Sequence, residues 1–278
     1  MNDTRPTMPQ AEDFRHESRV LAELLAPLAE DDYNIPTLFK GWTINDVLGH
    51  LHMFNVAAEL TLNDIAAFQV LFGRIARELA AGRSMLETQF SFLDGLHGRA
   101  LFDAWLAAAE RTADLYGQAD PKARVKWAGP DMSTLSAITA RQMETWAHGQ
   151  EVFDRLGAVL LESDRIRNIV HLGVNTYGWS FLNRGLPVPE PAPQLSLTAP
   201  SGTIWQWNTE QADNAISGLA VEFAQVVTQV RHIDDTALVT SGPTARRWME
   251  IAQRFAGKPE DPPARGSRHI ATPSPRGR

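Results

Sequence analysis

The pattern of apolar residues changes at a proline-rich stretch, residues 185–193. Four of the last seven residues in this stretch are prolines, which prevents regular secondary structure and favours extended backbone. Before the stretch, apolar residues recur about every 3.6 residues, the period of an amphipathic helix. After it, residues 194–198 and 203–208 alternate between apolar and polar, as the residues of strands do. The sequence therefore predicts a helical bundle over residues 10–184, a linker, and a small α+β domain over residues 194–257.

The first part contains long amphipathic segments joined by modest loops, a pattern typical of a mainly α protein. Thr43 is the predicted N-cap of the second long helix, because Asp46 stands three residues later, as in a capping box. That helix carries His50 in its second turn. The predicted helices cover residues 11–30, 43–62 with a continuation or kink toward 79, a weaker segment 82–92, 100–116, 131–157 and 163–183.

The second part is predicted to mix strands and helices. Residues 199–202 form a hairpin connection that ends on a glycine. A helix is predicted over residues 211–230, a strand over 236–240 and a last helix over 243–255. Residues 258–278 hold five prolines and few apolar residues, a composition typical of a disordered tail.

Composition limits the partners and the chemistry. The net charge of −7 argues against nucleic-acid binding driven by backbone phosphates, and no apolar run approaches the length of a membrane span. The polar first residues lack the apolar core of a signal peptide, so a cytoplasmic location is expected. The chain has no cysteine, which excludes disulfides, thiolate metal sites and a cysteine nucleophile. Any thiol chemistry would therefore need a thiol from outside the chain.

Glu144 and His148 are the best candidates for metal ligands. They stand four residues apart on a predicted helix and so lie on one face, one turn from each other. His50 is the best third donor, because apolar residues flank it on its helix. Two histidines and a glutamate with a vacant position are typical of a catalytic metal site. Zinc is the default ion for these ligands, with nickel, manganese and iron left open.

A glutamate and a histidine at this spacing also occur by chance on solvated helix faces. Burial favours the metal interpretation, because Met143 and Trp146 place the helix in the interior, where a bare carboxylate is costly. Gln142 and Gln150 are predicted to lie at the surface. Three other histidines are alternative ligands or bases, namely His97, His171 and His232. They are interpreted as surface or packing residues. His52 points away from the side of its helix that carries His50.

Two motifs resemble those of the DinB-like, maleylpyruvate isomerase N-terminal family. Residues 41–51, Gly-Trp-Thr-Ile-Asn-Asp-Val-Leu-Gly-His-Leu, resemble its GWT-x-x-D-x-x-x-H-L motif, and residues 144–154 resemble its second metal motif. The resemblance implies a four-helix bundle that holds a divalent metal. His50, Glu144 and His148 match the family's ligand positions. The other matches are assigned to packing (Trp42), helix capping (Asp46) and a role next to the ligands or at the surface (Asp154).

The second part resembles the sterol-carrier-like C-terminal domain of mycothiol-dependent maleylpyruvate isomerases, so that the resemblance covers roughly residues 15–256. It implies a catalytic role for Arg231, which follows the predicted helix as an active-site arginine does in that family. The alternative for Arg231 is a surface arginine at a helix C-terminus. Residues 231–239 depart from the isomerase pattern, which leaves the substrate open.

The resemblance implies a metal-dependent enzyme that uses a low-molecular-weight thiol, mycothiol, on a small carboxylate substrate. The reaction would be S-transfer, or cis–trans isomerisation by thiol addition, bond rotation and elimination. Arg231 would bind the substrate carboxylate. The alternatives are a metal-dependent hydrolase or hydratase without thiol, and a non-catalytic protein that binds a metal or small ligand. Either a monomer or a homodimer fits the sequence.

Overall fold

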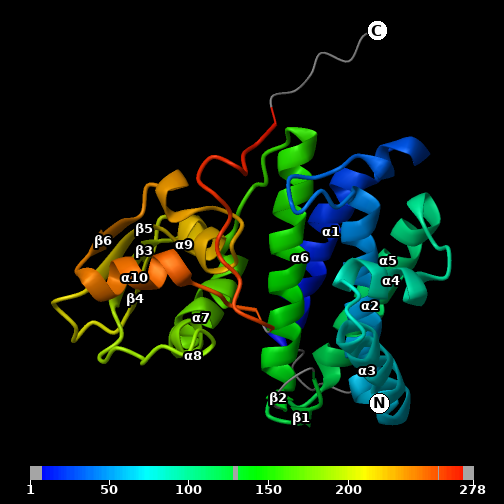
Figure 1. Cartoon of the computed structure of the whole chain (residues 1–278), viewed down its shortest axis with the longest axis horizontal. Coiled ribbons are helices and arrows are strands. Elements are labelled where there is room, and N and C mark those ends of the chain that lie inside the picture. Colours follow the sequence, from blue (N-terminus) through cyan, green and yellow to red (C-terminus); the bar gives the residue numbers. More distant parts are fainter. Residues whose placement is uncertain (1–7, 128–130, 256, 272–278) are drawn as a thin grey trace, which may run out of the picture. The chain divides into compact units, whose positions relative to one another are not determined.

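The computed structural model describes residues 8–127, 131–255 and 257–271 (Figure 1). The chain divides into two compact units, Met1–Val152 and Phe153–Arg278, and each is described by itself below. The division lies inside a long helix, and not at the proline-rich stretch 185–193 where the sequence predicted it. The reason is that the helical segments of residues 167–182, which precede the proline-rich stretch, pack on the helices of residues 220–251, which follow it.

The first unit is helical, and the mainly α fold with a small α+β part is confirmed. Its helices are α1 (Pro9–Leu25), η1 (Glu30–Asn34), α2 (Ile44–Asn63), α3 (Ile65–Ala80), α4 (Met85–Leu93), α5 (Gly98–Gln118) and α6 (Thr134–Leu156), of which α6 continues past the unit boundary. Two short strands, β1 (Arg124–Val125) and β2 (Met132–Ser133), pair antiparallel before α6. None of the helices within the described ranges combines the length and apolar character that a bilayer crossing requires.

Four of these helices, α1, α2, α5 and α6, form the bundle (Figure 1). Each contributes apolar side chains to one shared core, in which Phe14, Ala58, Tyr116 and Ile138 are almost completely buried. Burial of this apolar surface is the main force that holds the helices together. The packing brings the second turn of α2 against the middle of α6, where the candidate ligands lie.

The start of α2 is fixed by the predicted capping box. The Thr43 hydroxyl accepts a hydrogen bond from the Asp46 backbone N–H at 3.1 Å, and the Asp46 carboxylate accepts one from the Thr43 N–H at 2.9 Å. These two bonds satisfy backbone donors that the helix itself leaves unpaired. The predicted kink after residue 62 is a break, where Asp64 ends α2 and caps α3.

The second unit is a four-stranded sheet covered by helices. Its elements are η2 (Asp164–Ile166), α7 (Arg167–Asn175), α8 (Tyr177–Leu182), β3 (Gln194–Thr198), β4 (Ile204–Trp207), β5 (Ala215–Leu219), α9 (Ala220–Val227), η3 (Ile233–Asp235), β6 (Val239–Ser241) and α10 (Pro243–Ile251). The strand order is β4-β3-β5-β6, with β3 and β5 parallel. The hairpin between β3 and β4 is antiparallel, as predicted.

One face of this sheet is buried. Leu195, Leu197, Trp205 and Ile216 alternate with more exposed neighbours, so that the sheet has a single apolar face. Helix α9 packs against β3 and β5, and α10 contacts α8 through ring contacts centred on Trp248. The unit therefore has its own core.

Two predicted helices of the second unit differ from the structure. The predicted helix over residues 211–230 is a strand followed by a helix, because residues 215–219 pair with β3 along their whole length. Gly218 has φ +140 and lies where a Cβ would meet the Leu238 side chain at 2.9 Å. Pairing with a neighbouring strand outweighs local helix propensity here. The predicted helix 163–183 is likewise broken, at Thr176, between α7 and α8.

Residues 258–271, which the sequence placed in a disordered tail, are anchored to the second unit. The Gln229 side chain donates to the Glu260 carbonyl at 2.8 Å, and the Arg268 side chain donates to the Gln229 carbonyl at 2.9 Å. The Ala271 N–H donates to the Asp154 carbonyl at 2.7 Å. Hydrogen bonds to backbone carbonyls of this kind hold the segment although it has few apolar residues. Residues 272–278 of the predicted tail lie outside the described residues.

Candidate metal centre

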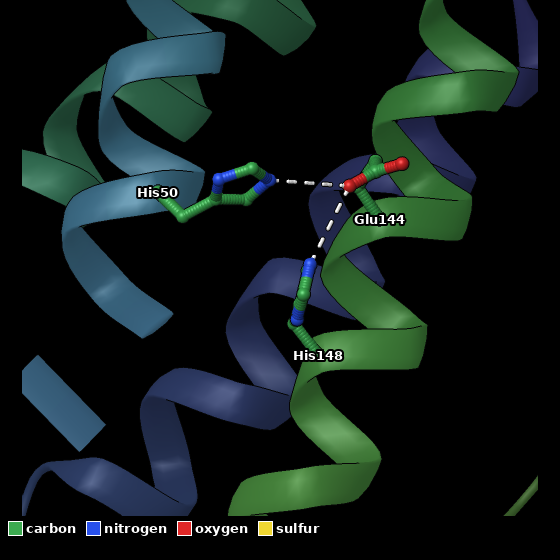
Figure 2. Close-up of side chains that lie close together, drawn as sticks. All are labelled: His50, Glu144 and His148. Carbon is green, nitrogen blue, oxygen red and sulfur yellow. Dashed lines mark hydrogen bonds and ion pairs between the residues drawn. The ribbon is translucent and has the colours of Figure 1, made fainter. Parts of the chain in front are cut away.

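Three side chains from two helices of the first unit converge on one point (Figure 2). Helix α2 supplies His50, and α6 supplies Glu144 and His148. His50 Nε2 lies 3.4 Å from Glu144 Oε2, and His148 Nε2 lies 3.6 Å from the same oxygen. One ligand atom from each residue lies within 4.8 Å of the other two. The structure thus brings together the three residues that the sequence singled out.

The arrangement fits a small divalent ion. Ligand atoms about 2.1 Å from a tetrahedral zinc lie about 3.4 Å from one another, close to the two distances to Glu144. The side chains of His50 and His148 are 12% exposed, and that of Glu144 is 22% exposed, so all three are mostly removed from water. A carboxylate between two imidazoles at this depth is a donor set that zinc, nickel, manganese or iron accepts.

Glu151 orients His148 and was missed from the sequence. Its Oε2 lies 3.0 Å from His148 Nδ1, and the glutamate side chain is only 5% exposed. With Nδ1 engaged by this carboxylate, Nε2 is the nitrogen that faces Glu144. A carboxylate behind a ligand histidine is the usual second partner in metal sites. The sequence did contain a signal for this contact, because His148 and Glu151 are three residues apart and so lie on the same face of the helix.

An aromatic wall covers one side of the cluster. The Trp42 ring is stacked on the His148 ring, with centroids 6.1 Å apart and planes 6° apart, and lies 5.5 Å from the His50 ring. The Phe39 ring meets the His148 ring edge-on at 5.1 Å. Both aromatic residues come from the turn before α2, which is held by a hydrogen bond from the Trp42 N–H to the Phe39 carbonyl. The GWT part of the motif therefore packs directly on the two histidines.

The two histidines have opposite pKa shifts. Burial lowers the pKa of His50 to about 4, although Glu144 opposes this effect. Burial also acts to lower the pKa of His148, but the Glu151 carboxylate and then Glu144 outweigh it and raise that pKa to about 9. The pKa of Glu144 lies well below its ordinary value, because hydrogen bonds to His148 and His50 outweigh the opposing effect of burial. At neutral pH the cluster holds one carboxylate, one neutral imidazole and one imidazolium.

Residues 14–153 match the family model described as the mycothiol maleylpyruvate isomerase N-terminal domain. The match covers half of the chain and contains all three candidate ligands. The chain belongs to this family.

Two relatives match this chain over nearly its full length. Two proteins of Mycobacterium tuberculosis, "Uncharacterized protein MT0041" of strain CDC 1551 / Oshkosh and "Uncharacterized protein Rv0036c" of strain ATCC 25618 / H37Rv, are each 34% identical to this chain over 258 residues. That region is 93% of this chain and 98% of each relative. The sequence similarity therefore extends well beyond the family model, into the second unit.

The fold is shared with solved structures. Crystal structures of the mycothiol-dependent maleylpyruvate isomerase, and of a histidine-to-alanine mutant of that enzyme, match with a TM-score of 0.52 and 15% identity. Each match covers 84% of this chain and 92% of the other. At this identity the likeness concerns the fold alone.

The other histidines that the sequence raised lie outside this family member's cluster. His52 is on α2 but packs 5.8 Å from the Phe92 ring, and its pKa is lowered to about 4 by burial. His97 precedes α5 as its N-cap and lies 2.7 Å from the Gly95 carbonyl. Two others are in the second unit: His171 accepts a hydrogen bond from Trp207, and His232 caps η3.

Two glutamines behave differently from the prediction. Gln142 and Gln150 were expected at the surface, but they are 0% and 6% exposed. Helix α6 is buried nearly all round its middle, and this leaves little of it for ordinary surface positions. A polar side chain was a poor guide to exposure on this helix, because buried amides are tolerated when they are hydrogen-bonded.

Arg231 is engaged in the second unit. Its Nη1 and Nη2 donate to the two carboxylate oxygens of Asp154, at 2.7 and 2.6 Å. The side chains are 11% and 5% exposed, so this is a buried bidentate pair and not an exposed arginine at a helix end. Asp154, to which the sequence assigned a place near the ligands or at the surface, is the arginine's partner.

Proposed function

We propose that this protein is a divalent-metal-dependent enzyme that uses a low-molecular-weight thiol, with mycothiol as the first candidate. The reaction is cis–trans isomerisation or S-transfer on a small carboxylate substrate. The observation that carries the proposal is the convergence of His50, Glu144 and His148 in a member of a family described by mycothiol and maleylpyruvate isomerisation. Zinc is the proposed ion.

The roles of the residues follow from their geometry. His50, Glu144 and His148 would hold the ion, and three protein ligands leave a coordination position for a small molecule. When bound, the ion would supply a Lewis acid that favours the thiolate form of a thiol and polarises a carbonyl. Glu151 holds the His148 ring so that Nε2 faces the other ligands. Trp42 and Phe39 shield that ring from water on one side.

The thiol must come from another molecule, because the chain has no cysteine. In the isomerisation, the external thiol adds to one carbon of an activated double bond and leaves a single bond that can rotate. Elimination then returns the thiol and restores the double bond in the trans form. Arg231 is proposed to bind a substrate carboxylate. To do so its guanidinium would have to exchange Asp154 for the substrate, because Asp154 now occupies both nitrogens.

Thiol dependence is tested on the cobalt-loaded protein, whose visible spectrum reports the ligands of the ion. Titration with mycothiol, and separately with glutathione and cysteine, should change the spectrum for at least one thiol. The matched alcohol, serine, is the control and should leave the spectrum unchanged. Indifference to every thiol would contradict the thiol-using function and favour metal-dependent hydrolysis or hydration. Absence of cobalt binding would favour a role without a metal.

A further inference from the structure

Arg141 shares the helix stripe that carries two of the candidate ligands. Residues 141, 144 and 148 follow the spacing of three and four that places side chains on one helix face. Arg141 is 3% exposed. Its charge interacts with Glu144 and is felt at His50, on the facing helix. A buried arginine thus lies one turn before Glu144 on α6.

The guanidinium has few partners. Its Nε donates to Asn55 Oδ1 at 3.1 Å, and its Cζ lies 5.8 Å from the centroid of the Phe54 ring. The Phe54 ring in turn is 4.7 Å from the His50 ring, so it lies close to both Arg141 and one of the candidate ligands. No carboxylate in the described ranges forms an ion pair with Arg141. Burial lowers its pKa to about 10, which still leaves the group charged at neutral pH.

Two buried donors of this hydrogen-bonded pair have no acceptor within the part of the chain that the structure describes. Arg141 Nη2 lacks a hydrogen-bond partner among the described residues, and so does Asn55 Nδ2. The amide orientation of Asn55 follows from the bond itself, because an arginine nitrogen can only donate and the atom that faces it must be the oxygen. Asn55 is completely buried. The pair therefore offers a positive charge and two N–H donors for which the described residues supply no acceptor.

This arrangement is unfavourable in the fold as it stands. A buried charge destabilises a protein unless it is paired, and an unmet buried donor adds a further penalty. Replacement of buried ionic groups by apolar ones is often neutral or stabilising. The missing component is an acceptor with negative charge. A planar carboxylate matches the two-pronged donor set of a guanidinium, and a charge-assisted bond of this kind is strong in a buried site.

The geometry points to Arg141, with Asn55, as the binding site for a carboxylate group of the substrate next to the metal centre. This assignment rests on the proposed function in one respect, since it takes the ligand of the site to be a small carboxylic acid. It adds to that function a residue that binds the substrate carboxylate inside the bundle, on the helix that carries Glu144 and His148. Phe54 lies close to both Arg141 and the ligand His50.

The test measures maleate binding by calorimetry, on the zinc-loaded and on the zinc-free protein. Arg141→Met should weaken maleate binding about tenfold or more, because a charge-assisted pair is lost. Arg141→Lys should restore part of the affinity for maleate, since lysine keeps the positive charge but lacks the planar two-donor geometry of the guanidinium. Maleamate, in which one carboxylate is an amide, should bind the wild type more weakly than maleate does. Its affinity should also fall less than that of maleate in Arg141→Met. Arg19→Met, a 53% exposed arginine on α1, is the matched control and should bind maleate normally.

Thermal unfolding of the same variants separates recognition from structure. Arg141→Met should melt at the wild-type temperature or above it, because an unpaired buried charge is removed. Equal maleate affinity in wild type and Arg141→Met would overturn the assignment, as would a loss of affinity in Arg231→Met alone. Failure of the wild type to load zinc would contradict the metal function, while maleate binding to the zinc-free protein would still decide the role of Arg141.

Discussion

At the scale of single residues, the properties of the candidate metal centre depend on how His148 is held between two carboxylates. Glu151 engages Nδ1, and Glu144 faces Nε2. The two negative charges keep a proton on the imidazole of the metal-free protein and raise its pKa to about 9. A metal ion must displace that proton, because only a neutral imidazole can be a ligand. Binding of a divalent ion would thus release one proton and replace one positive charge by two.

Metal affinity should therefore depend on pH. Below pH 9 the His148 proton competes with the ion, so zinc affinity should fall about tenfold for each unit between pH 9 and pH 7. Chelator competition at pH 7, 8 and 9 measures this slope, and calorimetry in two buffers counts the released proton. An affinity that is constant over this range would contradict the shifted pKa.

The raised pKa of His148 also makes the stability of the metal-free fold depend on pH. The folded pKa of His148 lies above its ordinary value of 6.5, so its stabilising contribution is fully present below pH 6.5 and is lost as the pH rises through about 9. His50 has the opposite sign, since its pKa is lowered to about 4. Its contribution is lost as the pH falls from 6.5 toward 4.

Glu151 should matter for the metal although it is not a predicted ligand. Glu151→Gln removes the charge behind His148 but keeps the size of the side chain, and zinc affinity should fall roughly 10–100-fold. Glu23→Gln, on the exposed side of α1, is the matched control. Competition with a fluorescent chelator measures both. If the two variants bind zinc equally well, Glu151 does not support the ligand.

At the scale of elements, the position of His50 depends on where α2 begins. The capping box of Thr43 and Asp46 fixes the first turn, and the turn before it carries Trp42 and Phe39 to the histidine rings. Helix α6 supplies the other ligands from its middle, where the bundle holds it on several sides. One helix start and one helix face thus determine the site.

Loss of the cap should destabilise the first unit. Thr43→Ala removes the hydroxyl that accepts from the Asp46 N–H, and the cost should be about 1 kcal/mol in the free energy of unfolding. Thr43→Ser keeps the hydroxyl and is the control. Urea unfolding followed by circular dichroism measures the difference. A serine variant as unstable as the alanine variant would show that the methyl group, and not the cap, is what matters.

Local signals account for what could be predicted from the sequence. The spacing of Glu144 and His148 and the cap at Thr43 act within one helix, so they are visible in the chain. The strand at residues 215–219 was missed because it depends on pairing with β3 and β6, which are distant in the sequence. The ion pair of Arg231 and Asp154, 77 residues apart, depends on packing between distant segments, and so do the unpaired donors of Arg141 and Asn55. Periodicity does not reveal such packing.

At the scale of the whole molecule, two units with separate cores share one chain. The candidate ligands all belong to the first unit, so metal binding should stabilise that unit. Zinc at about 100 times its dissociation constant would add about 2.7 kcal/mol to the folded state. For a unit of this size that corresponds to a rise of roughly 5–10 °C in its melting temperature.

Differential scanning calorimetry with zinc and with EDTA measures this shift. The transition of the first unit should move up with zinc and return with EDTA, while a separate transition of the second unit should stay in place. His148→Ala should abolish the shift, since it removes one ligand. An equal shift in this variant would place the stabilising ion elsewhere.

The most direct test of the metal centre is elemental analysis of purified protein. The wild type should carry about one divalent ion per chain, with zinc expected. His50→Ala and His148→Ala should each lose it, because two ligands do not hold the ion. His16→Ala, an exposed histidine on α1, should keep the wild-type content. Full occupancy in both ligand variants would contradict the assignment of His50, Glu144 and His148 as the metal site.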